Sequence, residues 1–427
     1  MADLSRIHAL EIFQNVLRRR QPMDAVIAGQ REFSRLTGPE QAFARRIVTT
    51  ALRRLGQIDD IIARCVEKPL PAKARIAQDV LRLGAAQLLF MEVPDHAAVD
   101  TSVRLFQARG EGGYAKLINA VLRRLTREAG AWLTAQDAAR LNTPDWLWRS
   151  WSAAYGDATC RHIAEAHLTE PPLDISVKSD PQGWAARLGG KVLPGGTIRL
   201  TNPGAVSSLQ GFEDGAWWVQ DIAAHIVSGL LGDISGKAVI DLCAAPGGKT
   251  ACLAAAGAHV TAVDRSAKRL NRLRENLERL KLTADVIEAD AATWRPAAAA
   301  DAVLLDAPCS ATGTLRRHPD VAYGKTETDV AKLATLQHRL LAAAADMVKP
   351  GGMVLYVTCS LQPDEGPAIT GQILSTDLPL VLAPITENDV HGLKETLTSD
   401  GQFRSLPHNL STDGGMDSFY ACRFQRI

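Results

Sequence analysis

Two cysteines each follow a short apolar run, and both could act as nucleophiles. Cys309 lies in Asp306-Ala-Pro-Cys-Ser310, and Cys359 lies in Thr358-Cys-Ser360. A single buried cysteine is usually a packing residue. Two cysteines at the ends of two strands of one sheet, with the carboxyl group of Asp306 close in sequence to the first, instead predict catalysis by a thiolate. Asp306, Cys309 and Cys359 are therefore the candidate catalytic residues.

A loop of small residues that could bind a cofactor precedes both cysteines in the chain. It follows the apolar run 237–242 and leads into the small-residue run 250–256. Small side chains let the backbone approach a ligand, and the amides at the start of the next helix point into the same space. The pattern is neither GxGxxG nor the Walker motif, which disfavours a nicotinamide or a nucleoside triphosphate. The candidate cofactor-binding residues of this loop are Cys243, Ala244, Ala245, Pro246, Gly247, Gly248 and Lys249.

Three aspartates stand at or after the ends of consecutive apolar runs in the same half of the chain. They are Asp264, Asp290 and Asp306. One aspartate after a strand means little, because turns favour this residue. Three of them beside the small-residue loop predict a binding site at the carboxyl edge of a parallel sheet, where an acid can accept hydrogen bonds from the ribose hydroxyls of a nucleoside cofactor.

A thiol, an acid and a nucleoside cofactor at one edge suit the methylation of carbon 5 of a cytosine. Carbon 5 is a poor nucleophile, but a thiolate that adds to carbon 6 makes it an enamine carbon that can attack a sulfonium methyl group. An acid against ring nitrogen 3 stabilises the developing charge. A second group then assists loss of the proton from carbon 5 and of the thiolate. The chemistry alone does not choose between Cys309 and Cys359 as the nucleophile.

The front of the chain predicts an all-helical domain over residues 1–128. Apolar residues recur at three- and four-residue spacing, and proline or glycine separates the repeats. The repeats cover residues 7–17, 43–55, 76–86 and 114–125.

The rest of the chain predicts two further parts. Residues 129–231 continue as helices and then change to short alternating runs separated by glycine and proline, which predicts linking helices and a small α/β subdomain. Residues 232–427 alternate strands with helices, which predicts a Rossmann-like α/β domain with a parallel sheet covered by helices on both faces.

The net charge of +1 conceals an asymmetry between the two ends of the chain. Residues 1–150 hold 23 Lys and Arg against 16 Asp and Glu, whereas the remainder holds 25 against 31. A basic front favours contact with a polyanion such as RNA, although arginines on solvated helix faces would give the same count.

The composition also indicates what the protein does not bind. Hydrophobic residues make up 46% of the chain, without an apolar run of the ~18 residues that a membrane span needs. The seven cysteines include no CxxC pair, so neither a zinc site nor a disulfide framework is expected. We expect a cytoplasmic protein without a membrane or metal partner, and the sequence indicates no oligomeric state.

Residues 237–366 resemble the RNA 5-methylcytosine methyltransferases of the Sun/RsmB group. The segments that carry the resemblance are Val239-Ile-Asp-Leu-Cys-Ala-Ala-Pro-Gly-Gly-Lys-Thr250, Asp306-Ala-Pro-Cys-Ser310 with Gly313 and Arg316-Arg317, and Thr358-Cys-Ser360. The front is similar to the NusB-like RNA-binding domain of the same family, notably in Pro94-Asp-His-Ala-Ala-Val99 and Leu117-Ile-Asn-Ala-Val-Leu-Arg123. This combination is typical of members that act on bacterial 16S ribosomal RNA, either free or in a partly assembled small subunit.

The resemblance implies a role for each candidate residue. The family binds S-adenosylmethionine through the loop that matches Cys243–Lys249 and through the acids that match Asp264, Asp290 and Asp306. Its nucleophile is the cysteine of Thr-Cys-Ser, here Cys359, and the cysteine of Pro-Cys, here Cys309, assists product release.

Three positions depart from the family pattern. Ala311 stands where glycine is usual, Tyr323 where tryptophan is common, and Gly366 where asparagine is frequent. We expect them to alter only the rim that meets RNA. Two other functions stay open: the same chemistry on 23S ribosomal or transfer RNA, and a non-catalytic NusB-like RNA-binding or antitermination module. The retained cysteines and Asp306 argue against the second.

Overall fold

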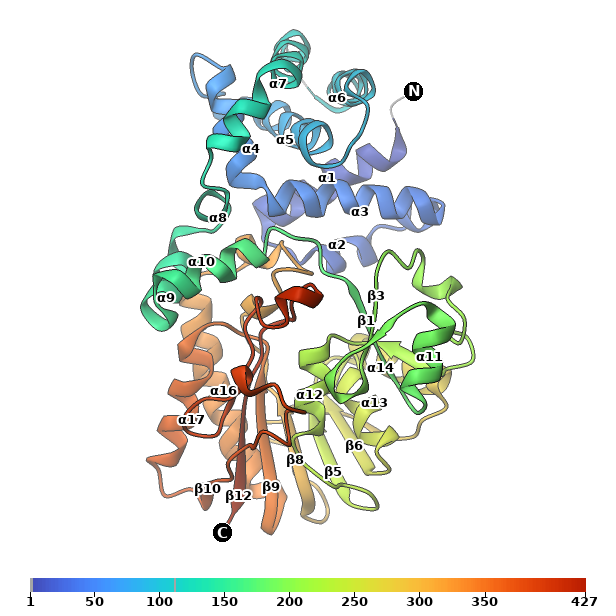
Figure 1. Ribbon diagram of the computed structural model, residues 1–427, viewed down its shortest axis with the longest axis vertical. Helices are drawn as coiled ribbons and strands as arrows, with labels where there is room; N and C mark the ends of the chain where they lie inside the picture. Colours follow the sequence, from blue (N-terminus) through green and yellow to red (C-terminus); the bar gives the residue numbers. More distant parts are fainter. Residues whose placement is uncertain (1–2, 111–112) are drawn as a thin grey trace. The chain divides into compact units, whose positions relative to one another are not determined.

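The computed structural model describes residues 3–110 and 113–427, and the chain divides into two compact units (Figure 1). The first unit contains the residues up to Glu170 together with Leu315–Thr326. The second contains Pro171–Thr314 and Glu327–Ile427. A short segment from the C-terminal half of the sequence therefore packs within the helical unit.

The first unit is helical, as the apolar spacing predicts. Its helices are α1 (Leu4–Arg19), α2 (Met23–Gly29), α3 (Gly38–Arg53), α4 (Leu55–Cys65), α5 (Arg75–Phe90), α6 (Asp95–Arg109), α7 (Ala115–Ala135), α8 (Ala138–Leu141), α9 (Asp145–Tyr155), α10 (Asp157–Ala166) and α15 (Val321–Gly324). Local chemistry sets the start of α3, where the side chains of Thr37 and Glu40 form a reciprocal capping box. The apolar faces of α1, α3, α5 and α7 bury a common core, which includes Phe13, Ile47 and Leu122.

A small antiparallel sheet opens the second unit, in agreement with the predicted α/β subdomain. Its strand order is β2-β3-β1-β4, and α11 (Pro181–Leu188) packs on it. The strands are β1 (Leu173–Val177), β2 (Lys191–Val192), β3 (Ile198–Leu200) and β4 (Trp217–Val219). Trp217 is fully buried in its core.

The larger sheet of the second unit has the strand order β10-β12-β9-β8-β5-β6-β7 (Figure 1). Its parallel part consists of β5 (Ala238–Leu242), β6 (His259–Asp264), β7 (Asp285–Glu288), β8 (Ala300–Asp306) and β9 (Val348–Thr358). The register pairs Leu242 with both Val263 and Leu305, so these parallel strands end at one level. The predicted carboxyl edge is thus formed.

The C-terminal end of the chain makes this sheet mixed, where the sequence predicts a parallel one. β12 (Tyr420–Arg426) pairs antiparallel with β9, and it also pairs antiparallel with β10 (Leu380–Leu382) and β11 (Phe403–Arg404). Strand β12 is largely buried and carries Tyr420 and Phe424 into the core. Antiparallel neighbours need no crossover helix between them. The alternation of strands and helices in the sequence therefore does not reveal β12.

Helices cover both faces of the larger sheet. One face packs against α12 (Ile222–Gly229), α13 (Gly248–Ala255) and α14 (Ala267–Leu280), and the other packs against α16 (Glu327–Met347) and α17 (Pro367–Leu374). Alternate residues of β9 divide between the two cores: Leu355 faces the first and Tyr356 the second. No helix in the described part of the chain is long and apolar enough to cross a membrane.

Candidate active site

The candidate residues converge on the carboxyl edge of the larger sheet. The small-residue loop follows β5, Asp264 ends β6, Asp290 follows β7, and Asp306 ends β8. Cys359 follows β9 directly, and the register places Asp306 beside Val357, two residues before it. The structure therefore brings together the loop, the acids and the cysteines that the sequence proposes as one site.

The small-residue loop is held by its backbone. The Ala244 N–H donates to the Val263 carbonyl at 3.1 Å, and the Gly247 N–H donates to the Ala244 carbonyl at 2.9 Å. Gly247 has φ +101°, and a Cβ there would lie 2.9 Å from Leu273 Cγ, so this position needs glycine. Cys243 also takes a left-handed conformation, with φ +61°. Burial raises the pKa of its thiol to about 12, which fits a packing role.

The acids of the edge differ in their surroundings. Asp264 is 2% exposed, and its carboxylate accepts hydrogen bonds from the Ala245 N–H at 3.2 Å and the Ser266 N–H at 3.0 Å. It also forms an ion pair with Arg269 at 3.3 Å. Asp290 is exposed and accepts from the Ala292 N–H at 2.9 Å. Asp264 thus shapes the loop, whereas Asp290 lies at the rim.

Asp241, inside β5, is a fourth acid of the site that the sequence reasoning did not single out. It is fully buried, and its Oδ2 accepts from the Thr250 hydroxyl at 2.6 Å. Its Oδ1 is buried without a hydrogen-bond partner among the described residues. Burial raises the pKa of this carboxyl to about 7. The sequence could have indicated Asp241 only through its position, two residues before the small-residue loop.

Lys249 joins the cofactor loop to the candidate catalytic acid. Its ammonium lies 2.8 Å from Asp306 Oδ2 and 5.0 Å from the centroid of the Phe419 ring. Burial by itself would lower the pKa of Lys249, but the Asp306 carboxylate outweighs burial and the pKa is raised. The Cys359 sulfur acts in the same direction. Lys249 is therefore a charged group next to the candidate catalytic residues, a role beyond the predicted place in the loop.

The two candidate cysteines are in contact. Cys309 Sγ lies 3.4 Å from Cys359 Sγ, and both side chains are partly accessible. The hydrogen bond between the thiols, together with burial, raises the pKa of Cys309 well above its usual value. A raised pKa suits Cys309 to donating a proton.

Two further residues, Gly313 and Glu365, contact the loops that carry Cys309 and Cys359. Neither is among the site residues predicted from the sequence. The Gly313 N–H donates to the Cys359 carbonyl at 3.0 Å, and a Cβ at Gly313 would lie 2.0 Å from the Ser418 carbonyl oxygen. Glu365 is fully buried and accepts hydrogen bonds from both loops. The sequence shows only that Glu365 follows the Thr-Cys-Ser motif.

The departures from the family pattern have structural explanations that concern more than the rim. Ala311 has φ +60°, the conformation that favours glycine. Tyr323 lies in the helical unit, where its hydroxyl donates to the Leu52 carbonyl at 3.0 Å. Gly366 is buried, and a Cβ there would lie 2.9 Å from Arg404 Nη2 and 3.0 Å from Tyr420 Cγ. The expectation that these positions alter only the rim is therefore wrong for Gly366.

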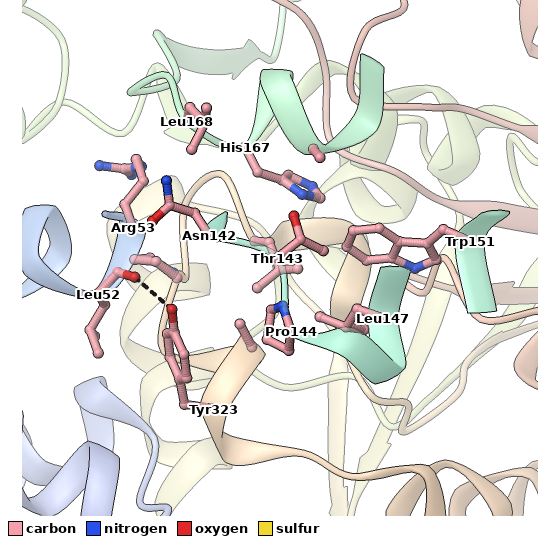
Figure 2. Close-up of a pocket in the computed structure, with 14 residues that line it drawn as sticks. Leu52, Arg53, Asn142, Thr143, Pro144, Leu147, Trp151, His167, Leu168 and Tyr323 are labelled. Carbon is pink, nitrogen blue, oxygen red and sulfur yellow. Dashed lines mark hydrogen bonds between the residues drawn. The ribbon is translucent and has the colours of Figure 1, made fainter. Parts of the chain in front are cut away.

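A small, partly open cavity in the helical unit is too small to be a substrate site. It has a volume of about 30 Å³ and is lined by Leu52, Arg53, Thr143, Trp151, His167 and Tyr323, among others (Figure 2). That volume is about the space that one water molecule takes in the liquid. Among the described residues, no group of three or more His, Cys, Asp or Glu side chains is arranged to hold a metal ion.

Comparison with family models covers both ends of the chain. The model for the NusB family matches residues 3–127, and the model for the 16S rRNA methyltransferase RsmB/F matches residues 230–425. Ribosomal RNA small subunit methyltransferase B of Pasteurella multocida (strain Pm70) is 36% identical over 395 residues, which cover 88% of this chain and 86% of that protein. The protein of the same name from Klebsiella pneumoniae subsp. pneumoniae is 32% identical and covers 98% of this chain and 97% of its own.

Solved structures share the fold at lower sequence identity. The crystal structure of PH0851 matches with a TM-score of 0.74 at 21% identity, covering 98% of this chain and 99% of its own. The structure of NSun6 from Pyrococcus horikoshii with SFG matches with a TM-score of 0.57 at 17% identity, covering 66% of this chain and 98% of its own.

The cofactor is S-adenosylmethionine, and the residues at the sheet edge fit it. The unpartnered, buried oxygen of Asp241 offers an acceptor to a donor-bearing ligand, and the small residues of the loop Cys243–Lys249 are those that let a backbone approach a nucleoside cofactor closely. The relatives that match most of the chain are named as methyltransferases of the small-subunit ribosomal RNA. With its NusB domain in front and its methyltransferase domain behind, the chain belongs to the RsmB/F family of 16S rRNA methyltransferases.

Proposed function

We propose that this protein methylates carbon 5 of a cytosine in 16S ribosomal RNA through a covalent bond between Cys359 and carbon 6. The observation that carries the proposal is the contact of 3.4 Å between the sulfurs of Cys359 and Cys309, beside the pair of Lys249 and Asp306. Methylation of an exocyclic nitrogen or of a ribose hydroxyl needs no thiol, so two adjacent thiols favour attack on a ring carbon.

Cofactor binding is assigned to the loop and to the acids of the sheet edge. S-adenosylmethionine, when bound, supplies an electrophilic methyl group. Asp264 is assigned to the ribose hydroxyls, because it ends the second strand and is buried against the loop. Asp290 and the residues Cys243–Lys249 complete the binding surface.

Cys359 is assigned as the nucleophile because it matches the Thr-Cys-Ser cysteine of the RNA 5-methylcytosine methyltransferases that the chain resembles, and the electrostatics of the site agree with this assignment. The raised pKa of Cys309 keeps that residue a neutral thiol, which can donate its proton toward the Cys359 sulfur. The Lys249 ammonium stabilises a thiolate at Cys359. The thiolate forms a bond to carbon 6, and the electron pair of the 5,6 double bond moves through the ring toward nitrogen 3.

Asp306 and Cys309 are assigned to the proton transfers. Asp306 is positioned to pass a proton from the Lys249 ammonium, which donates to its Oδ2 at 2.8 Å, to nitrogen 3 as charge develops there. After methyl transfer, water takes the proton from carbon 5, and nitrogen 3 returns its proton through Asp306 to Lys249. The electron pair of the broken C–H bond restores the 5,6 double bond as the bond to Cys359 breaks. Cys309 donates a proton to the departing sulfur at 3.4 Å.

RNA is the substrate class, and we propose that the parts of the chain share its binding. Residues 1–128 supply the positive surplus, residues 129–231 link the parts and contribute the small sheet, and residues 232–427 carry out the reaction. The 16S RNA is bound either free or in a partly assembled small subunit.

The test is methyl transfer by the full-length protein. Labelled S-adenosylmethionine is incubated with unmodified 16S RNA, 23S RNA or transfer RNA, and the product is digested to nucleosides. We expect label in 5-methylcytosine from 16S RNA and none with Cys359→Ala. Label in another base, or a preference for 23S or transfer RNA, would contradict the proposal. RNA binding without any transfer would favour the non-catalytic module.

A further inference from the structure

A buried carboxylate connects the two loops that carry the cysteines. Glu365 has no exposed surface. Its Oε1 accepts a hydrogen bond from the Ser310 N–H at 2.8 Å, and its Oε2 accepts from the Ser310 hydroxyl at 2.5 Å and the Ser360 hydroxyl at 2.6 Å. Ser310 follows Cys309 and Ser360 follows Cys359, so one side chain binds the residue after each cysteine.

We propose that Glu365 is a positioning residue, whose carboxylate holds Cys309 and Cys359 in contact. This inference rests on the proposed function, in which Cys359 attacks and Cys309 donates the final proton. Among the described residues, Glu365 forms hydrogen bonds with the two serines and not with either cysteine sulfur. It therefore acts through the serines.

The carboxylate is itself fixed from several sides. Gln337 of α16 donates to Glu365 Oε1 at 3.1 Å and to the Pro308 carbonyl at 2.9 Å. The Tyr356 hydroxyl and the Thr358 hydroxyl donate to the Glu365 carbonyl oxygen at 2.8 and 3.2 Å. Glu365 therefore has little freedom to move, which a residue that positions others requires.

The hydroxyl of Thr312 also contacts both loops and completes the network of hydrogen bonds. Thr312 Oγ1 lies 3.3 Å from the Ser310 hydroxyl oxygen and 3.3 Å from the Ser360 hydroxyl oxygen, and it accepts a hydrogen bond from the Leu361 N–H at 3.0 Å. Each serine has one hydroxyl proton, and Glu365 Oε2 is the acceptor at the shorter distance in both cases. The serine hydroxyls of both loops therefore donate to the Glu365 carboxylate.

The charge of Glu365 has a chemical consequence as well as a geometric one. The negative charge of Glu365 adds to the hydrogen bond with Cys359 and to burial in raising the pKa of Cys309. A charged carboxylate at this place therefore favours Cys309 as a proton donor and disfavours it as a nucleophile.

Two variants separate geometry from charge. Glu365→Gln keeps the size of the side chain, and its amide can still bond both hydroxyls, because a hydroxyl can also accept. Glu365→Leu removes both the charge and the hydrogen bonds. Asp364→Asn is the matched control, because Asp364 is the exposed acid next in sequence.

The first readout measures the contact between the thiols without any RNA. Diamide accepts two electrons and two protons from a pair of thiols, which then form a disulfide. The sulfurs at 3.4 Å need to approach by only about 1.4 Å to bond. We expect rapid Cys309–Cys359 cross-linking, read by peptide mass spectrometry, in the wild type, Asp364→Asn and Glu365→Gln, and at least tenfold slower cross-linking in Glu365→Leu.

The second readout measures the charge. Alkylation of Cys309 by iodoacetamide, followed against pH, should shift to lower pH in Glu365→Gln and stay unchanged in Asp364→Asn. With unmodified RNA, Glu365→Leu should lower kcat about 100-fold, as loss of alignment does, while KM and the Kd for S-adenosylmethionine change by less than about twofold.

The outcomes distinguish this inference from the proposed function. Wild-type cross-linking in folded Glu365→Leu, or an unchanged alkylation profile of Cys309 in Glu365→Gln, would overturn the positioning role. If Glu365→Leu fails to fold, the alkylation profile of Glu365→Gln decides. A methylated product other than 5-methylcytosine would contradict the proposed function and leave both thiol readouts as expected.

Discussion

Asp264 Oδ2 accepts a hydrogen bond from the Ala245 N–H at 3.2 Å, which joins the end of β6 to the loop after β5. The same carboxylate is assigned to the ribose of the cofactor. Under the proposed function, Asp264 therefore shapes the loop and also binds the ribose. A substitution there must separate the two effects.

Asp264→Asn keeps an acceptor for one of the two backbone N–H groups that bind Asp264, and it removes the charge that strengthens hydrogen bonds to the ribose hydroxyls. Charge-assisted hydrogen bonds contribute about 1.5–3 kcal/mol each, so we expect S-adenosylmethionine to bind at least tenfold more weakly. Calorimetry measures the Kd, and thermal unfolding checks that the loop stays ordered. Wild-type affinity in a folded Asp264→Asn protein would place the ribose elsewhere.

Arg46 tests whether the helical unit contacts RNA. It is exposed, has no side-chain partner among the described residues, and lines a groove with Arg45, Arg317 and His318. Each lost phosphate contact should lower the slope of log K against log salt by about 0.7–0.9. Arg46→Ala should therefore weaken RNA binding and reduce the slope, whereas the control Arg35→Ala should not, because Arg35 is paired with Glu32 at 2.6 Å. If the two variants gave equal slopes of log K against log salt, Arg46 would not contact RNA.

Asp241 should make stability depend on pH. Burial raises its pKa to about 7 from an ordinary value of 3.8, so between these values the folded protein binds the proton more tightly than the unfolded chain does. The contribution of Asp241 to the free energy of unfolding is thus greatest below pH 4 and falls as pH rises toward 7, by an amount on the order of a few kcal/mol.

Asp241→Asn removes this titration and keeps an acceptor for the Thr250 hydroxyl. Urea unfolding at several pH values should show that the variant gains stability relative to the wild type between pH 4 and 7. Parallel pH profiles of the two proteins would show that Asp241 stays ionised when folded.

Gly313 should tolerate no side chain. A Cβ at this position would lie 2.0 Å from the Ser418 carbonyl oxygen and 2.9 Å from the Cys359 carbonyl oxygen. We expect Gly313→Ala to lower the free energy of unfolding by about 1–3 kcal/mol, as overpacking does, and to lower kcat. Gly371→Ala is the control, because a Cβ there meets nothing within 4 Å and alanine favours the helix. Similar stability of both variants would contradict the described packing of the Cys359 loop.

The parts of the fold that follow local rules could be predicted from the sequence. The spacing of apolar residues gives the helices of the first unit, and the order of apolar runs gives the parallel strands β5 to β9 with their acids at one edge. The antiparallel strand β12 could not be predicted in this way, because its pairing with β9 is not part of the alternation of strands and helices that indicates parallel strands.

The site shows the same division. Cys309, Cys359 and Asp306 stand in short motifs whose chemistry is visible in the residue types. Glu365 shows no such signal, because its function depends on two serines that only the fold brings to its carboxylate. The packing of Leu315–Thr326 within the helical unit could not be predicted either, because in the sequence this segment lies between two parts of the α/β unit.

The most direct test of the central claim compares two cysteine variants on one denaturing gel, with unmodified 16S RNA and labelled S-adenosylmethionine. Cys359→Ala lacks the nucleophile and should form no covalent complex and no product. Cys309→Ala should still attack and transfer the methyl group but stall before release, because the proton donor 3.4 Å from the Cys359 sulfur is lost. We therefore expect a labelled protein–RNA band that survives denaturation from Cys309→Ala alone. A labelled covalent band from Cys359→Ala, and none from Cys309→Ala, would contradict the assignment of Cys359 as the nucleophile.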